Sequence, residues 1–232
     1  MRPHVVVNVA VSADGKLSTF ERRQVKISGP EDFRRVDRLK AGADAVMVGI
    51  GTVLADDPSL TVKDPDLIAG REAAGRGPHP VRVVVDSQGR CPLDAAVLHR
   101  GPGMRVVAVS AACPPERRAA LEAYATVIVA GEETVDLALL LGELASLGVE
   151  RLMVEGGGTL IGALLSAGLV DEVFVYMGNM IIGGATAPTL ADGPGRSASE
   201  PFVRLELAGV RPCEEGVLLH WRVGKESEPG LT

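Results

Sequence analysis

Short apolar runs rich in β-branched residues alternate along the chain with segments of helical periodicity. The runs fall at residues 5–11, 45–49, 81–85, 105–109, 126–129, 151–154 and 170–177. Such continuous hydrophobicity is typical of strands buried on both faces. Helices are expected from Ser28, as N-cap, through Lys40, over 115–125 and over 135–147. Residues 203–208 and 217–223 alternate in polarity, as in an antiparallel hairpin. The sequence therefore predicts an α/β fold with a mostly parallel central sheet, flanking helices and an antiparallel C-terminal hairpin.

Composition limits the number of domains and the class of partner. With 46% hydrophobic and 23% charged residues, the 232-residue chain is expected to be globular rather than disordered. We see no linker or repeat and expect a single domain over residues 1–232, with 225–232 as a flexible tail. The net charge of −6 argues against nucleic acid or an acidic membrane as the main partner. An anionic ligand would need a local cluster of Lys or Arg.

Cysteine and histidine are too sparse for a metal or disulfide framework. Cys91, Cys113 and Cys213 lie far apart, which indicates free thiols in a reducing cytoplasm. The four histidines show no paired spacing, so we expect no metal site. No apolar run approaches the roughly 20 residues of a membrane span, and the N-terminal residues carry no secretory signal. These features predict a cytoplasmic protein without membrane contact.

Three consecutive glycines follow the apolar run at 151–154. Glu155 ends the run, Gly156-Gly157-Gly158-Thr159 comes next, and residues 160–165 have the spacing of an apolar helix face. A strand, a glycine turn and a helix N-terminus can bind an anion, because the backbone can approach it closely and the first-turn N–H groups have no helical partner. The G-x-G-x-x-G spacing of dinucleotide sites is absent. The motif alone fits an anion site or a structural turn.

Polar and small residues recur where the other predicted strands end. Ligands of parallel α/β sheets bind at the carboxyl ends of strands, so these residues form one candidate site. Glycine, hydroxyl and carboxylate groups suit a phosphorylated or nucleotide ligand better than a metal. No P-loop or G-x-S-x-G nucleophile motif occurs. The candidates are Asp14, Gly15 and Lys16; Gly49, Gly51, Thr52 and Asp56; Asp86 and Ser87; Ala130 and Gly131; and Glu155 through Thr159.

The sequence at 49–62, GIGTVLADDPSLTV, resembles the reductase domain of riboflavin biosynthesis. Four further landmarks of that family appear in order, at 8–16, 27–29, 84–86 and 155–158. The resemblance implies a dihydrofolate-reductase-like fold. The zinc-binding signature of the family's deaminase domain is not found in these residues, so the chain looks like the stand-alone archaeal and fungal branch.

That branch acts on 2,5-diamino-6-ribosylamino-4(3H)-pyrimidinone 5′-phosphate, with hydride passing from NADPH C4 to C1′. The deaminated substrate, 5-amino-6-ribosylaminouracil 5′-phosphate, is the alternative, and NADH is the alternative cofactor. A non-catalytic nucleotide-binding module of the same fold is the competing class of function. The family also implies a homodimer.

The resemblance assigns site residues one by one. Lys40 and Lys63 stand where bacterial relatives often have arginine, and Lys26 replaces a tryptophan. By resemblance, the substrate is bound by Ser28, Lys40, Leu60, Lys63 and Glu155, and the cofactor by Thr52, Asp56, Val85, Asp86, Ser87, Val129, Ala130, Gly131, Gly156, Gly157, Gly158 and Thr159. The proton donor is expected among Asp14, Lys16 and Glu155.

Overall fold

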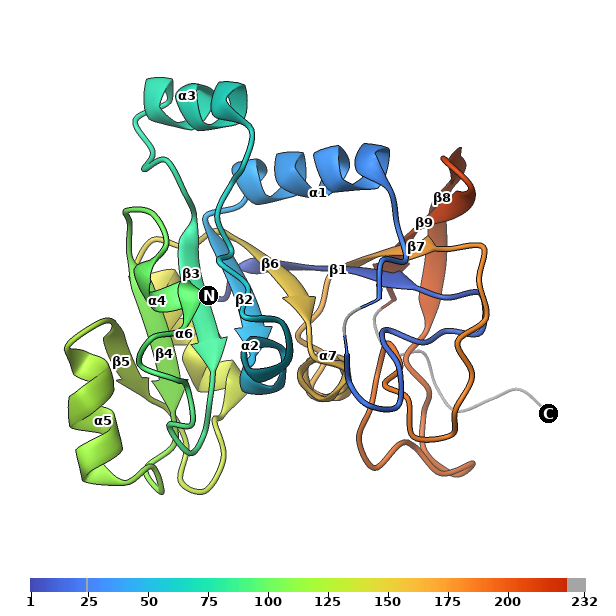
Figure 1. Cartoon of the computed structure of the whole chain (residues 1–232). Coiled ribbons are helices and arrows are strands. Elements are labelled where there is room, and N and C mark those ends of the chain that lie inside the picture. The colour runs from blue at the N-terminus through green and yellow to red at the C-terminus, as the bar shows by residue number, and fades with distance from the viewer. Residues whose placement is uncertain (24, 225–232) are drawn as a thin grey trace.

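The computed structural model describes residues 1–23 and 25–224, so the predicted flexible tail at 225–232 lies outside the described residues. Within them the chain forms one nine-stranded sheet with the order β5-β4-β3-β2-β6-β1-β7-β9-β8 (Figure 1). The strands are β1 (His4–Val11), β2 (Ala45–Gly49), β3 (Val81–Val85), β4 (Arg105–Val109), β5 (Thr126–Val129), β6 (Arg151–Gly156), β7 (Glu172–Met177), β8 (Leu205–Cys213) and β9 (Gly216–Val223).

Strand direction follows the prediction. Neighbours from β5 to β7 are parallel, whereas β9 pairs antiparallel with both β7 and β8. The carboxyl ends of β1, β2, β3 and β6 therefore meet at one edge of the sheet.

Helices cover both faces of the parallel part. On one face α6 and α7 bury leucine and isoleucine against β1, as with Leu144 and Ile161. On the other face, residues of α1, α2, α4 and α5 join a second apolar cluster, which includes Met153. Figure 1 shows α1 and α7 on opposite sides of the sheet. The helices are α1 (Pro30–Gly42), α2 (Ile50–Asp56), α3 (Pro65–Ala73), α4 (Ala96–His99), α5 (Pro115–Glu122), α6 (Leu137–Ser146) and α7 (Gly158–Ser166).

Two local features differ from the prediction. Strand β6 continues through Glu155 to Gly156, because a register shift after Met47 pairs Val48 with Gly156. The short helices α2 and α4 were not expected. None of the helices formed by the described residues is both long and apolar enough to cross a bilayer.

The predicted N-cap of the first helix is wrong. Gly29, not Ser28, is the N-cap of α1, and glycine has no side chain that could cap the helix. Instead the Glu214 carboxylate, in the β8–β9 turn, accepts a hydrogen bond of 2.8 Å from the backbone N–H of Glu31. A carboxylate at this end also complements the helix dipole. Ser28 is thereby left free of the capping role.

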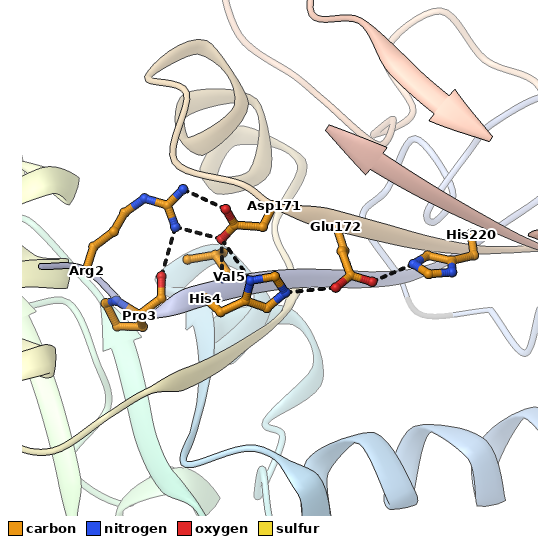
Figure 2. A network of polar contacts seen from close by, with 7 residues as sticks. All are labelled: Arg2, Pro3, His4, Val5, Asp171, Glu172 and His220. Carbon is orange, nitrogen blue, oxygen red and sulfur yellow. Dashed lines mark hydrogen bonds and ion pairs between the residues drawn. The ribbon is translucent and has the colours of Figure 1, made fainter. Parts of the chain in front are cut away.

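A polar network fastens the start of the chain to β7 and β9 (Figure 2). Arg2 forms a bidentate ion pair with Asp171, at 2.6 and 2.8 Å. Glu172 binds His4 through one carboxylate oxygen, at 2.8 Å, and His220 through the other, at 2.5 Å. The network therefore joins strands that are far apart in sequence, at the sheet edge opposite the strand ends considered below.

Candidate active site

A large cavity of 1210 Å³ lies at the carboxyl ends of the central strands. Its walls come from the end of β1 and the following loop, from α2, from the β3 exit and from the turn between β6 and α7. Twelve of the predicted site residues line it, as expected from the shared sheet edge. They are Ser28, Gly49, Gly51, Thr52, Asp56, Val85, Ser87, Glu155, Gly156, Gly157, Gly158 and Thr159.

The glycines of the turn do different work. Gly156 and Gly157 have φ of 153° and 89°, values that residues with a Cβ rarely adopt. A Cβ on Gly157 would point toward Thr52 Oγ1 at 3.5 Å. A Cβ on Gly158 would instead overlap the Thr189 carbonyl oxygen. The second glycine therefore shapes the cavity beside Thr52, and the third lets the chain at 189–192 pack on the first turn of α7.

The wall formed by α2 brings Thr52 and Asp56 to the cavity on successive turns. Thr52 offers a hydroxyl beside the glycine turn. Desolvation by the cavity walls raises the pKa of Asp56 above its usual value. The pair provides a hydroxyl donor and a carboxylate acceptor next to the predicted anion site.

At the β3 exit, Ser87 and Arg90 line the cavity but Asp86 does not. Asp86 is fully buried, accepts a 2.7 Å bond from the Cys91 N–H and lies 3.7 Å from Arg90. Ser87 accepts a 3.0 Å bond from the Val135 N–H, which holds the next loop in place. The Asp86 carboxylate thus closes the turn, and its contact with the cofactor stays a prediction.

The predicted residues at the β5 exit lie outside the cavity lining. Val129 is exposed and Ala130 is buried, and Gly131, with φ of 85°, turns the chain. The loop that follows contributes Thr134 and Val135 instead, and α6 contributes its first residue, Leu137. The prediction placed this wall a few residues too early, because the chain folds back before it reaches the cavity.

Asp14 and Lys16 do not reach the cavity either. Asp14 accepts bonds from the Ser12 hydroxyl at 2.6 Å and from two backbone N–H groups, of Ile182 at 3.0 Å and Gly183 at 2.7 Å. These bonds lower the pKa of Asp14 to about 2. The Lys16 ammonium donates to the Ala187 carbonyl at 3.3 Å. Both residues thus fasten the segment after β7 to the β1 exit, and their catalytic role stays a prediction.

Glu155 lines the large cavity and forms an ion pair of 3.0 Å with Lys40. The side chains are only 14% and 16% exposed, respectively. Lys40 also lines a smaller cavity of 610 Å³ between α1 and residues 63–65. The ion pair therefore lies where the two cavities adjoin.

Lys63 lines the small cavity with Lys40. Its ammonium donates to the hydroxyls of Ser59 and Thr61, both at 2.7 Å. Partial burial and then the nearby charge of Lys40 lower the pKa of Lys63. Leu60, between these hydroxyl residues, is buried in the core with a left-handed φ of 54° and lines neither cavity with its side chain. Its predicted contact with the substrate stays a prediction.

Sequence reasoning missed most of the cations in the large cavity. Arg22, Lys26 and Arg90 all line it. They are cationic groups that can attract an anionic ligand to the cavity. Arg90 had a signal, since it follows the β3 exit by a few residues, whereas the loop carrying Arg22 and Lys26 has no regular pattern.

No metal centre is formed by the part of the chain that the structure describes. Among residues 1–23 and 25–224, no group of three or more His, Cys, Asp or Glu side chains could hold a metal ion. The site thus consists of a glycine turn, hydroxyls, carboxylates and cations.

Comparison with known proteins decides the family. The model of the RibD C-terminal domain matches residues 3–219. The chain belongs to the RibD C-terminal domain family. It is 54% identical over 193 residues to the 2,5-diamino-6-ribosylamino-4(3H)-pyrimidinone 5′-phosphate reductase of Archaeoglobus fulgidus, covering 83% of this chain and 88% of that protein. It is 47% identical to the reductase of the same name from Methanothermobacter thermautotrophicus, covering 96% of this chain and 99% of that one.

The fold is shared with a solved RibD structure. Acinetobacter baumannii RibD superposes with a TM-score of 0.77 at 26% identity, over 97% of this chain. The chain spans 59% of the length of that protein. The likeness confirms the predicted fold class.

Proposed function

We propose that the chain is the NADPH-dependent reductase that converts 2,5-diamino-6-ribosylamino-4(3H)-pyrimidinone 5′-phosphate into its ribitylamino counterpart in riboflavin biosynthesis. One observation carries the proposal. The 1210 Å³ cavity has the glycine turn, Thr52 and Arg90 in its walls, and Glu155 joins it to a second, lysine-lined cavity. One cavity suits a dinucleotide and the other a phosphate. The choice of substrate rests on the two archaeal relatives, which are named as reductases of this pyrimidinone phosphate.

The cofactor would lie along the large cavity. The turn at Gly157 and the start of α7 suit the pyrophosphate, because a helix N-terminus presents unpaired N–H groups to an anion. Arg90 and Ser87, together at the β3 exit, suit the 2′-phosphate and favour NADPH over NADH. Asp56 would accept from a ribose hydroxyl. When bound, the cofactor supplies the hydride that adds to C1′.

The substrate would extend from Glu155 toward the small cavity. Lys63 and Lys40 offer cations for the 5′-phosphate, and the hydroxyls of Ser59 and Thr61 lie beside them. Ser28 and Glu155 line the large cavity, where the pyrimidine would meet the cofactor. The protein's contribution is mainly orientation and electrostatics.

A spectrophotometric assay tests the function. We expect NADPH oxidation with the diaminopyrimidine substrate, and slower oxidation with the deaminated pyrimidine or with NADH. A Thr52→Val variant removes a hydroxyl of the cavity wall at nearly constant volume, and it should raise KM for NADPH. Binding of NADPH without consumption of either pyrimidine would support the nucleotide-binding module and reject the enzyme.

We further propose a homodimer in a reducing cytoplasm. Strand β8 is the sheet edge and exposes Leu205, Leu207 and Val210, an apolar edge that a second copy could cover. The three cysteines are free and buried, which suits a reducing compartment. Sedimentation analysis that finds only monomer at micromolar concentration would reject the dimer.

A further inference from the structure

The turn between β8 and β9 holds the segment that leads into α1. The Glu214 carboxylate accepts a 2.8 Å hydrogen bond from the backbone N–H of Glu31. It also packs directly on Gly29, where a Cβ would lie 2.5 Å from both carboxylate oxygens. A second link, the Arg211–Glu31 ion pair of 3.7 Å, has side chains about half exposed and contributes little. The Glu214 carboxylate is therefore the main polar contact between this turn and the start of α1.

The turn is a firm support, because it packs on the end of β7. Gly216 lies so close to this strand that a Cβ there would be 2.7 Å from the Tyr176 hydroxyl. Cys213, at the other end of the turn, is buried in a small apolar cluster with Tyr176 and Ile27. Since β9 pairs with β7 along its length, the turn cannot shift without disturbing the sheet. Glu214 therefore extends from a rigid base toward α1.

The backbone of Glu214 has a conformation that favours glycine. Cys213 and Gly216 pair at the end of the hairpin, so Glu214 and Glu215 form a two-residue loop. Glu214 has φ of 53°, and hairpin loops with a positive φ at the first of two positions prefer glycine there. A glutamate in this place carries a backbone strain that glycine would avoid. The turn itself gains nothing from the glutamate, whereas α1 gains the contact with its carboxylate.

The segment that Glu214 holds lines both cavities. Ser28, directly before Gly29, is buried and lines the large cavity. Phe33, in the first turn of α1, lines the large and the small cavity. The glycine turn and Thr52, where the cofactor is proposed to bind, belong to other elements. A shift at the start of α1 would therefore move the wall proposed for the pyrimidine and leave the cofactor wall in place.

Resting on the proposed function, we infer that Glu214 is a positioning residue for the pyrimidine substrate. Its carboxylate fixes the start of α1 on the β8–β9 turn and so holds Ser28 and Phe33 in place as part of the cavity walls. Glu214 lines neither cavity itself and acts through these two residues. Loss of the carboxylate should therefore weaken binding of the pyrimidine and leave binding of NADPH unchanged.

Glu214→Gly separates the positioning role from fold stability. The variant removes the carboxylate but also relieves the unfavourable φ, so its urea midpoint should stay above that of Glu214→Ala. KM for the diaminopyrimidine should rise about 3- to 10-fold, as expected for one lost hydrogen bond. The loss concerns binding, so kcat should stay within about twofold, and the dissociation constant of NADPH should not change.

Two variants and one measurement without substrate complete the test. Glu214→Gln keeps an acceptor oxygen and should retain the KM of the unaltered protein. Glu215→Ala is the matched control, since the Glu215 carboxylate accepts from Asn179 and not from α1, and it should leave KM unchanged. The Glu31 N–H lies in the first turn of α1, where it has no partner within the helix. Its amide exchange, followed by NMR, should therefore be faster in Glu214→Gly and unaltered in Glu215→Ala.

The outcomes separate the two proposals. A KM of Glu214→Gly within about twofold of the unaltered protein, or unchanged exchange of the Glu31 amide, would overturn the positioning role while leaving the reductase intact. Equal weakening of pyrimidine and NADPH binding would indicate a general loosening of the fold and would overturn it as well. Failure of the unaltered protein to oxidise NADPH with either pyrimidine would overturn the proposed function, and the positioning role with it.

Discussion

Gly157→Ala should weaken NADPH binding while leaving the protein folded. The residue has φ of 89° and begins α7 as its N-cap. Placing alanine in this left-handed region costs about 1–2 kcal/mol, which a domain with 5–15 kcal/mol of stability tolerates. The added Cβ makes ordinary contacts, 3.5 Å from Thr52 Oγ1 and 3.8 Å from the Gly49 backbone. No steric clash therefore destabilises the fold. The methyl group would, however, lie between the turn and a phosphate that binds there.

The expected loss of affinity follows from the contacts displaced. One charge-assisted hydrogen bond from backbone N–H to phosphate contributes about 1.5–3 kcal/mol, so losing it weakens NADPH binding roughly 10- to 150-fold. Fluorescence titration of NADPH gives the dissociation constant, and urea unfolding followed by circular dichroism gives the stability.

Gly158→Ala is the matched contrast, since its Cβ would overlap the Thr189 carbonyl oxygen and approach the Asp192 carboxylate. That variant should lose more stability and less affinity than Gly157→Ala. The reasoning is refuted if Gly157→Ala binds NADPH within about threefold of the unaltered protein, or if it proves the less stable of the two.

Three further predictions concern charge. Burial alone would raise the pKa values of Asp171 and Glu172, but hydrogen bonds from Arg2 and from the two histidines lower both. Carboxyls with lowered folded pKa values stabilise the fold above their unfolded pKa values, so stability should fall as pH drops from about 5 to 3. Glu172→Gln should flatten that loss in urea titrations, and an unchanged slope would contradict this. Glu214→Ala should lower the free energy of unfolding by about 1 kcal/mol through loss of the α1 cap, and no change in urea midpoint would show that the cap is dispensable. Arg90→Ala should raise KM for NADPH about fivefold, since the side chain is half exposed, and an equal rise for NADH would argue against 2′-phosphate recognition.

The architecture could be predicted because its signals are local. Each parallel strand is a short β-branched run, and each exit carries small or polar residues. Hydrophobic periodicity therefore located seven parallel strands and the final hairpin within the described residues. The cavity residues Thr52, Ser87 and Glu155 followed from the rule that parallel strands present their carboxyl ends at one edge.

The errors involve contacts between residues remote in sequence. Ser28 has the chemistry of an N-cap. The carboxylate that takes this role belongs to Glu214, which lies 183 residues after its partner Glu31 in the sequence. Asp14 stands at a strand exit, but the segment after β7 engages its carboxylate. The Lys40–Glu155 pair joins a helix and a strand more than a hundred residues apart. No local pattern encodes such partners, which only the packed sheet brings together.

The place of β1 in the sheet has a consequence for how the chain acquires its structure. This first strand pairs with β6 on one side and β7 on the other. Val6, for example, pairs with Met153 of β6 and with Glu172 of β7. Strand β1 is therefore synthesised first but cannot pair until strands well over a hundred residues later in the chain have been made. Long loop closures slow folding, and unpaired strand edges meanwhile favour aggregation. Refolding of this protein should accordingly be slow, and its yield should fall steeply as concentration rises.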